Sequence, residues 1–324
     1  MDPRLAAELT ANEVTDEEFV EAAFRHILRR LPDEEARVRA LSKLSEGTLS
    51  RATLIHELAT SEESVRVREL DDAVALGLGS RVRGERVRWL QAPARTDERV
   101  VEIPWVLSRL RAAGRVLEVG YAFAETAYLG ALLRSGVELV GVDLATRDVE
   151  GMETIEADVR DLPFPDRSFD QVLLVSTLEH IGADNTVYGL GAEDDGDARV
   201  QALHELKRVL RANGGLLVTV PLGEPGDHGW FRQEDEQGWT ELFARADFFV
   251  EESEAYELVD DGWRAAPAFR PEGVRYGERG PAASAVLCAE LSPGRLRHLA
   301  TPGGLRKATR RRAARAYRRI RPDL

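Results

Sequence analysis

The chain has 324 residues, of which 43% are hydrophobic and 31% are charged, so it is long enough for two domains and has the composition of a soluble globular protein. No apolar run approaches the roughly 20 residues of a membrane-spanning helix, and the acidic N-terminal stretch MDPRLAAELTANEVTDEE lacks a signal-peptide core, so we expect a cytoplasmic protein. The net charge of −13 disfavours general nucleic-acid binding, and the single cysteine, Cys288, excludes an internal disulfide framework and a cysteine-cluster metal site.

Residues 1–70 are predicted to form a small all-helical bundle. Thr15 and Glu18 have the spacing of a capping box, Asp33 is placed to begin a second helix, and Ser50 is placed to cap a third. Residues 19–64, which begin FVEAAFRHIL, resemble a bacterial helical module of unknown function that is related to phycobilisome linker domains and occurs in glycan-associated proteins. The resemblance implies a carbohydrate-related context and specifies no chemistry.

Residues 71–96, which are rich in Arg, Gly and Pro, are expected to be a connector. Beyond residue 115, short apolar segments alternate with amphipathic ones. The predicted strands are 115–120, 137–143, 153–156, 171–176 and 215–221, with helices at 124–135 and 197–212 and two late strands near 247–252 and 283–290. This alternation predicts an α/β domain over residues 97–292, with a mainly parallel sheet, helices on both faces, and ligands at the carboxyl ends of the strands.

The segment VLEVGYAFAE, residues 116–125, is the predicted turn after the first strand of this domain. It fits a dinucleotide loop poorly, because Glu125 stands where the third glycine of G-x-G-x-x-G would pack. The run from Glu118 through Gly120 and Ala122 to Ala124 resembles motif one of class I S-adenosylmethionine-dependent methyltransferases, which reads acid-x-Gly-x-Gly-x-Gly. Each alanine costs about 1 kcal/mol if its position needs positive φ and fits if φ is negative.

Further family-like segments follow in order. LVGVDLA ends the second strand at Asp143, whose carboxylate is expected to accept both ribose hydroxyls. Asp158, in EADVRDLPFPDRSFD, resembles the family acid that contacts the adenine amino group. The resemblance implies a Rossmann-like methyltransferase sheet and S-adenosylmethionine as cofactor. The implied cofactor-binding residues are Glu118, Gly120, Tyr121, Ala122, Asp143, Leu144, Asp158, Val159 and Ser176. Tyr121 could instead pack over the loop. Structural roles are the alternatives for the acids: a helix-dipole or salt-bridge partner for Glu118, a helix cap for Asp143 and a turn residue for Asp158.

The segment STLEHI follows the fourth strand of the domain, beside the expected position of the transferring methyl group. His180 is our first candidate for the general base that removes a hydroxyl proton, because an imidazole titrates near neutral pH. Glu179 is the second candidate. The alternative is that His180 hydrogen-bonds the loop backbone or shapes the pocket.

Two polar loops are expected to contact the acceptor. The loop GADNTVYGLGAEDDGDARV contains Asp194, Asp195 and Asp197, which are candidate ligands for Mg²⁺ or, alternatively, part of a solvated acidic loop in which Asp197 caps the next helix. The candidate acceptor-binding residues are Tyr188, His228, Trp230 and Arg232. An aromatic side chain beside polar groups suits a sugar ring, and the alternative is a lid packed on the core.

From these features we expect O-methylation of a sugar hydroxyl in a glycan, polysaccharide or glycosylated product. One alternative is methylation of a lipid, quinone or secondary metabolite, which would favour an apolar acceptor pocket around His180 and Trp230. Another is a non-catalytic scaffold whose altered glycine loop no longer binds the cofactor.

The C-terminal tail, residues 293–324, is strongly basic: residues 295–324 carry eleven Arg or Lys against one acid. It is expected either to dock on the acidic body or to contact an anionic membrane surface or anionic glycolipid. With a membrane contact, we expect the protein to lie peripherally at the inner membrane face. RNA is disfavoured, because no basic-aromatic RNA module accompanies the tail.

Overall fold

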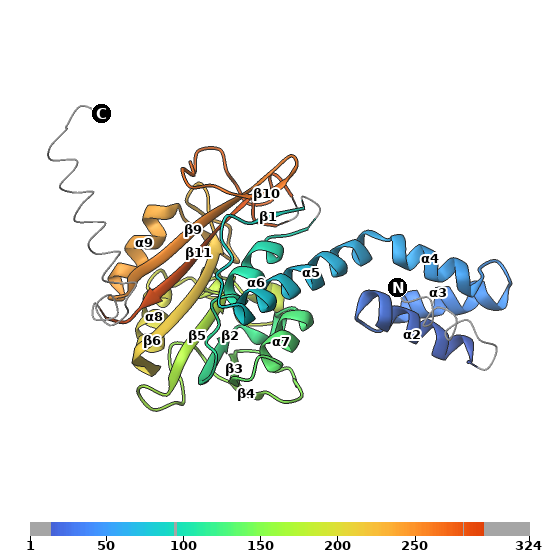
Figure 1. Ribbon diagram of the computed structural model, residues 1–324, viewed down its shortest axis with the longest axis horizontal. Helices are drawn as coiled ribbons and strands as arrows, with labels where there is room; N and C mark the ends of the chain where they lie inside the picture. Colours follow the sequence, from blue (N-terminus) through green and yellow to red (C-terminus); the bar gives the residue numbers. More distant parts are fainter. Residues whose placement is uncertain (1–13, 94–95, 281, 295–324) are drawn as a thin grey trace. The chain divides into compact units, whose positions relative to one another are not determined.

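The computed structural model describes residues 14–93, 96–280 and 282–294. The chain divides into two compact units, Met1–Ala75 and Leu76–Leu324 (Figure 1), which are described separately. Within the described residues, no helix is both long enough and apolar enough to cross a membrane. The predicted basic tail lies almost wholly outside the described residues, so its membrane and glycolipid contacts stay predictions.

The first unit is a helical bundle with the predicted caps. Its helices are α2 (Asp16–Leu28), α3 (Glu34–Ser45), α4 (Arg51–Thr60) and the first part of α5 (Glu62–Val82). Thr15 and Glu18 form the reciprocal capping box of α2, Asp33 caps α3, and Ser50 caps α4. The bundle has its own apolar core, made of Phe19, Val20, Ala23, Phe24, Leu28, Ala40, Leu54 and Ile55.

Helix α5 differs from the predicted connector, because residues 71–82 are helical and the boundary between the units falls inside the helix. Gly77, which suggested a connector, allows α5 to lie close to α6 (Arg99–Leu107). A Cβ at Gly77 would come within 2.8 Å of Pro104 Cα and of Leu107 Cβ. The glycine is therefore a packing residue inside a helix, and not a sign of a flexible segment.

The second unit is built on a nine-stranded sheet of order β1-β10-β9-β11-β6-β5-β2-β3-β4 within the described residues. The strands of its parallel part are β2 (Arg115–Val119), β3 (Glu138–Asp143), β4 (Glu153–Glu156), β5 (Phe169–Val175) and β6 (Leu210–Pro221). The antiparallel strands are β11 (Ala285–Ser292), β9 (Phe249–Val259), β10 (Gly262–Ala265) and β1 (Gln91–Ala92). A short hairpin of β7 (Gly226–Asp227) and β8 (Arg232–Gln233) stands apart from this sheet.

Helices cover both faces of this sheet. Figure 1 shows α8 (Ala198–Val209) and α9 (Glu236–Arg245) on one side, and α6 and α7 (Thr126–Leu133) on the other. Alternate strand residues such as Leu117 and Val218 share a core with α8 and α9, whereas Glu118 points the other way and contacts Tyr128 of α7. This is the expected Rossmann-like α/β fold, in which the chain leaves the neighbouring strands β2 and β5 toward helices on opposite faces, and a ligand crevice is expected at that point.

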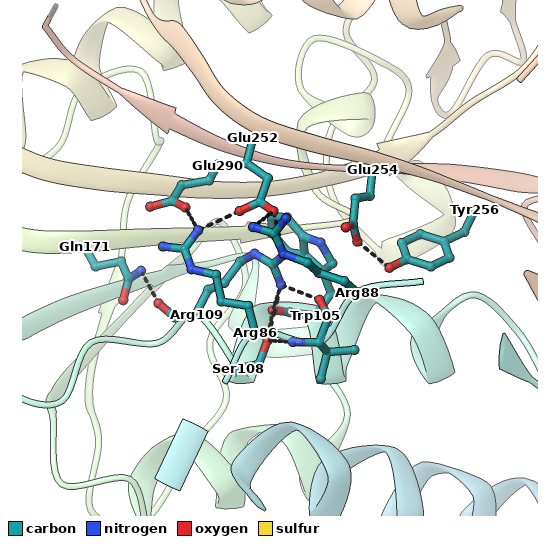
Figure 2. A network of polar contacts seen from close by, with 11 residues as sticks. Arg86, Arg88, Trp105, Ser108, Arg109, Gln171, Glu252, Glu254, Tyr256 and Glu290 are labelled. Atoms are coloured by element: carbon teal, nitrogen blue, oxygen red, sulfur yellow. Dashed lines mark hydrogen bonds and ion pairs between the residues drawn. The ribbon is translucent and has the colours of Figure 1, made fainter. Parts of the chain in front are cut away.

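The later part of the predicted connector is fixed to the sheet by a polar network (Figure 2). Arg86 Nη1 lies 2.6 Å from Oε2 of Glu252 in β9 and 2.6 Å from Oε2 of Glu290 in β11. The buried guanidinium of Arg109 stacks on Trp105 with its Cζ 3.8 Å from the ring centroid, and its Nη2 lies 3.3 Å from Glu252 Oε1. The network ties the end of α6 and the segment before β1 to the antiparallel strands.

Candidate active site

A cavity of about 260 Å³ opens at the carboxyl ends of β2, β3 and β5. The predicted residues that line it are Glu118, Gly120, Asp143, Leu144, Asp158, Val159, Ser176, His180 and Tyr188. It also receives Arg99 from α6, Phe123 from the first loop and Glu193 from the long polar loop. Tyr121 and Ala122, which were predicted to bind the cofactor, are not part of its lining.

The loop after β2 needs glycine at one position only. Gly120 has φ +88°, and a Cβ there would come within 2.9 Å of Thr177 Cγ2 and closer still to Thr177 Oγ1. The following residues, Tyr121–Phe123, form a 3₁₀ turn, and neither Ala122 nor Ala124 has positive φ, the latter having φ −69°. The two alanines therefore cause no backbone strain.

Tyr121 packs against β3 under the loop and does not line the cavity. Its side chain is fully buried, and a Cβ at Gly141 of β3 would lie 2.8 Å from Tyr121 Cδ1. Its hydroxyl accepts a hydrogen bond from the Arg147 backbone N–H at 3.3 Å. The contribution of Ala122 is its backbone N–H, which donates to Asp143 Oδ2 at 3.0 Å.

Glu118 presents a buried carboxyl at the end of β2. The Tyr128 hydroxyl donates to its Oε2 at 2.9 Å, and burial raises the pKa of Glu118 to about 8. At neutral pH this group is mostly protonated, and a nearby cation would favour its ionised form.

Asp143 stands at the end of β3 and shapes the loop as well as the cavity. Its Oδ2 accepts from the Ala122 N–H, and its Oδ1 accepts from the Ala145 N–H at 3.1 Å. Each oxygen keeps a second lone pair for a donor in the cavity. Leu144, 46% exposed, follows on the cavity rim.

Asp158 is already engaged by an arginine that the sequence did not single out. The Arg160 guanidinium donates to both carboxylate oxygens at 2.6–3.0 Å, which holds the pKa of Asp158 below its usual range. Arg160 Nη1 also lies 2.5 Å from Glu193 Oε1. This ion pair joins the segment after β4 to the long polar loop across the cavity, while Val159 is buried in the cavity wall.

Ser176 directly follows β5 and has a strained conformation, with φ +43°. Its hydroxyl donates to Glu102 Oε1 at 2.8 Å, and the other oxygen of the fully buried Glu102 lies 2.5 Å from Arg99 Nη1. Arg99 and Glu102 are not identifiable from local sequence, because charged residues near the start of a helix are typical of a solvated first turn.

A second cavity of about 70 Å³ adjoins the first, and Arg99, Ser176, His180 and Tyr188 line both. The other lining residues are Glu98, Glu179, Pro221, Trp230, Phe231, Tyr276, Ala283 and Val286. The aromatic rings contact one another: His180 stacks on Trp230 with centroids 5.1 Å apart, and Tyr276 lies 4.5 Å from Phe231. Tyr276 carries no signal in the sequence, because it lies 96 residues after His180 in a loop without a motif.

His180 is oriented by a backbone carbonyl. Its Nδ1 lies 2.9 Å from the Trp230 carbonyl oxygen, so Nδ1 carries the donated proton and Nε2 is left as an acceptor. Burial lowers the pKa of His180 to about 4, and the ring is therefore neutral at pH 7. Its Nε2 lies 3.8 Å from Glu179 Oε1.

Glu179 is buried in the second cavity. Its Oε2 has no hydrogen-bond partner among the described residues, and burial raises the pKa of this carboxyl to about 8. A buried carboxyl with an open oxygen is placed to meet a polar group of a ligand.

Two predicted acceptor-binding residues lie outside this lining. His228 is exposed and stacks on the outer side of Phe231, with centroids 4.4 Å apart. Arg232 forms ion pairs with Asp194 at 2.6 Å and Asp227 at 3.2 Å. It therefore fastens the long polar loop to β8.

The three candidate magnesium ligands do not converge. Asp194 pairs with Arg232, Asp195 accepts from the Asp197 N–H at 2.9 Å, and Asp197 pairs with Arg245 at 2.8 Å. The described residues contain no group of three or more His, Cys, Asp or Glu that could hold a metal ion. The magnesium site expected in this loop is therefore not supported.

Two protein-family models match the chain. The family described as a methyltransferase domain matches residues 117–218, from β2 to near the end of β6, which include most of the larger cavity. The family described as a domain of unknown function (DUF4214) matches residues 4–67. That match adds no support for a phycobilisome-linker relation, which stays a prediction.

Among curated proteins, the ubiquinone/menaquinone biosynthesis C-methyltransferase UbiE of Hahella chejuensis (strain KCTC 2396) is 30% identical over 118 residues, 36% of this chain. The match spans 41% of that relative's length.

Similar solved structures share little sequence. The 1,6-didemethyltoxoflavin-N1-methyltransferase of Burkholderia thailandensis, solved with 1,6-didemethyltoxoflavin and S-adenosylhomocysteine, is 17% identical with a TM-score of 0.41, covering 84% of this chain and 89% of that one. A SAM-dependent methyltransferase of Methanosarcina mazei is 13% identical with a TM-score of 0.41, covering 58% and 95%. The family match supports the predicted methyltransferase domain over residues 117–218, and the strand order agrees with the predicted Rossmann-like sheet.

Proposed function

We propose that the chain is an S-adenosylmethionine-dependent methyltransferase that methylates a hydroxyl of a small planar ring, of the phenol or quinol type. The observation that carries the proposal is the aromatic second cavity, which joins the larger cavity at Ser176 and His180. Rings on several sides favour a flat acceptor, because each can stack on it or meet it edge to face. The ubiquinone/menaquinone C-methyltransferase matched over 118 residues supports a quinone-type ring, whereas the choice of an oxygen as the methylated atom rests on His180.

The larger cavity suits the cofactor. Gly120 leaves the backbone clear where a Cβ would collide, Glu118 is placed for a cationic amino group, and Asp143 has acceptor lone pairs for ribose hydroxyls. Leu144 and Val159 supply an apolar edge for the adenine. When bound, the cofactor supplies an electrophilic methyl group on a sulfonium.

In this proposal His180 removes the acceptor's proton. Its Nε2 accepts the hydroxyl proton as the oxygen forms its bond to the methyl carbon, while the carbon–sulfur electron pair stays with sulfur. The Trp230 carbonyl accepts from Nδ1–H, which orients Nε2 and favours the imidazolium that forms. The proton then leaves to solvent.

A sugar hydroxyl, in a glycan or glycosylated product, is the second candidate acceptor. It is favoured by the carboxyls of Glu98 and Glu179, which lie among the aromatic rings and suit the dense donors of a sugar. The scaffold alternative is disfavoured by the loop after β2, since neither of its alanines has a positive φ that would call for glycine.

The first experiment is calorimetric titration with S-adenosylhomocysteine of the wild-type protein and of Asp143→Ala. We expect micromolar binding that weakens by about tenfold or more in the variant, roughly 1.4 kcal/mol for a lost hydrogen bond to a charged group. Unchanged affinity in Asp143→Ala would refute the ribose assignment. No binding by the wild type would favour the scaffold.

The second experiment measures transfer of a labelled methyl group to hydroquinone, 1-naphthol and methyl glycosides. We expect transfer to the phenolic acceptors, and His180→Ala should lower kcat by about 10²–10⁴-fold, the range for general base catalysis. The same variant should keep its affinity for S-adenosylhomocysteine. Full turnover in His180→Ala would remove this residue as the base, and transfer to glycosides alone would select the sugar candidate.

A further inference from the structure

A guanidinium lies where the two cavities meet. Arg99 is the first residue of α6, and its side chain, 29% exposed, lines both the larger and the smaller cavity. No feature of the sequence assigned it a role.

Most of the hydrogen-bonding capacity of Arg99 is open to the cavities. Among the described residues, its side chain makes one hydrogen bond, to the buried Glu102 at 2.5 Å, and Glu102 is held on its other side by Ser176. A guanidinium carries five N–H donors in a rigid fork, so several remain for a ligand.

The groups around Arg99 leave its charge available. Glu98 and Glu179 line the smaller cavity with it, and Glu118 lines the larger one. Burial raises the pKa of these carboxyls to about 7, 8 and 8, respectively. Glu118 and Glu179 are therefore mostly neutral at pH 7, whereas Glu98 is about half ionised. Glu102 pairs directly with the guanidinium, and Glu98 and Asp97 attract it more weakly.

We propose that Arg99 binds an anionic oxygen of a ligand at the junction of the two cavities. The inference rests on the proposed function and adds a recognition residue to it. Two sources present this chemistry: the α-carboxylate of the cofactor's methionine part, and the ionised hydroxyl oxygen of the acceptor. With the first source, the ligand's carboxylate would lie beside Arg99 and its α-amino group beside Glu118, because both residues line the same cavity.

The test compares two ligands that differ in this carboxylate. S-adenosylhomocysteine has an amino-acid part, whereas 5′-methylthioadenosine has the same nucleoside without it. Both are titrated into wild type, Arg99→Lys and Arg99→Met/Glu102→Gln; the double variant avoids leaving Glu102 as a buried unpaired charge. Arg264→Met is the matched control. Arg264 lies on β10 and forms an ion pair with Glu257 of β9, outside both cavities.

If the cofactor carboxylate is the ligand, the double variant should bind S-adenosylhomocysteine about 10–100-fold more weakly and 5′-methylthioadenosine as tightly as wild type. Arg99→Lys should lie between, because a lysine keeps the charge and loses the fork. If the acceptor oxygen is the ligand, both nucleosides should bind normally and kcat for hydroquinone should fall in the double variant, because the oxygen becomes anionic only as its proton leaves.

Equal weakening of both nucleosides would show a structural role and overturn the proposal, as would unchanged nucleoside affinities together with an unchanged kcat. Retained 5′-methylthioadenosine binding also shows that the variant is folded. Failure of the wild type to bind S-adenosylhomocysteine would instead refute the proposed function.

Discussion

At the scale of single residues, the site depends on backbone angles that the sequence leaves open. Ala124 occupies the place of a family glycine, yet its φ of −69° is one that any residue adopts. Gly120, at φ +88°, has both the unusual angle and the close neighbour. The altered motif is thus compatible with a working loop.

Two substitutions in this loop test which of its positions needs glycine. Gly120→Ala should weaken S-adenosylhomocysteine binding by about tenfold or more, because the new Cβ collides with Thr177 and the αL angle costs about 1–2 kcal/mol. Ala124→Gly should bind no more tightly than wild type, since no positive φ is relieved there. Calorimetric titration measures both, and tighter binding by Ala124→Gly would contradict the assigned loop geometry.

The buried Glu179 predicts how stability depends on pH. Its pKa is about 8 in the folded protein against an ordinary 4.5, so the folded state holds a proton that the unfolded state has lost and stability falls as pH rises from about 4.5 to 8. His180, with its pKa lowered to about 4 from 6.5, acts oppositely below pH 6.5. Between pH 6.5 and 8, the pH dependence of stability therefore includes the contribution of Glu179 and not that of His180.

In that window Glu179→Gln should lose less stability per pH unit than wild type, by up to about 1.4 kcal/mol per unit for one proton. Urea unfolding at pH 6.5 and 8 measures the difference. Glu205→Gln, at an ion pair outside the cavities, is the control and should keep the wild-type slope over this range. Parallel slopes for wild type and Glu179→Gln would contradict the assignment of a buried, protonated carboxyl.

At the scale of elements, the long polar loop forms part of the wall of the larger cavity. It contributes Tyr188 and Glu193 to the lining, and the Arg160–Glu193 ion pair fastens it across the cavity. Its aspartates bind arginines and backbone groups around the loop instead of a shared ion.

The fastening predicts a kinetic effect. Glu193→Gln should speed dissociation of S-adenosylhomocysteine a few-fold, since a partly exposed ion pair contributes about 0.2–1 kcal/mol to the closed loop. Stopped-flow displacement measures the rate. Asp194→Asn, whose partner Arg232 lies outside the cavity lining, is the matched control and should keep the wild-type rate; equal acceleration in both variants would argue against a specific Arg160–Glu193 contact.

At the scale of the whole molecule, the chain has separate apolar cores in its two units. Phe19 is fully buried in the helical bundle, and Phe243 of α9 is buried in the core of the second unit. The residues that line the two described cavities all belong to the second unit.

This separation predicts independent responses to core substitutions. Phe19→Ala should destabilise the bundle by about 3–5 kcal/mol and leave S-adenosylhomocysteine affinity at the wild-type value. Phe243→Ala, the same change in the other core, should lower both the stability of its unit and the affinity. Urea unfolding and calorimetry on the full chain distinguish these outcomes, and a loss of affinity in Phe19→Ala would show that the bundle is coupled to the site.

The sequence by itself determined the features that depend on neighbouring residues. Helix caps at Thr15, Asp33 and Ser50, the alternating strands, and the placement of Glu118, Gly120 and Asp143 at strand ends all follow from local pattern. The tertiary structure decided which side chains meet. It brought Arg99 and Tyr276 to the cavities from distant segments, turned Tyr121 into the core, and gave Arg232 and the three aspartates separate partners. Local pattern sets the backbone conformation and the alternation of faces, whereas side-chain partners depend on packing between segments far apart in the chain, which no short window of sequence contains.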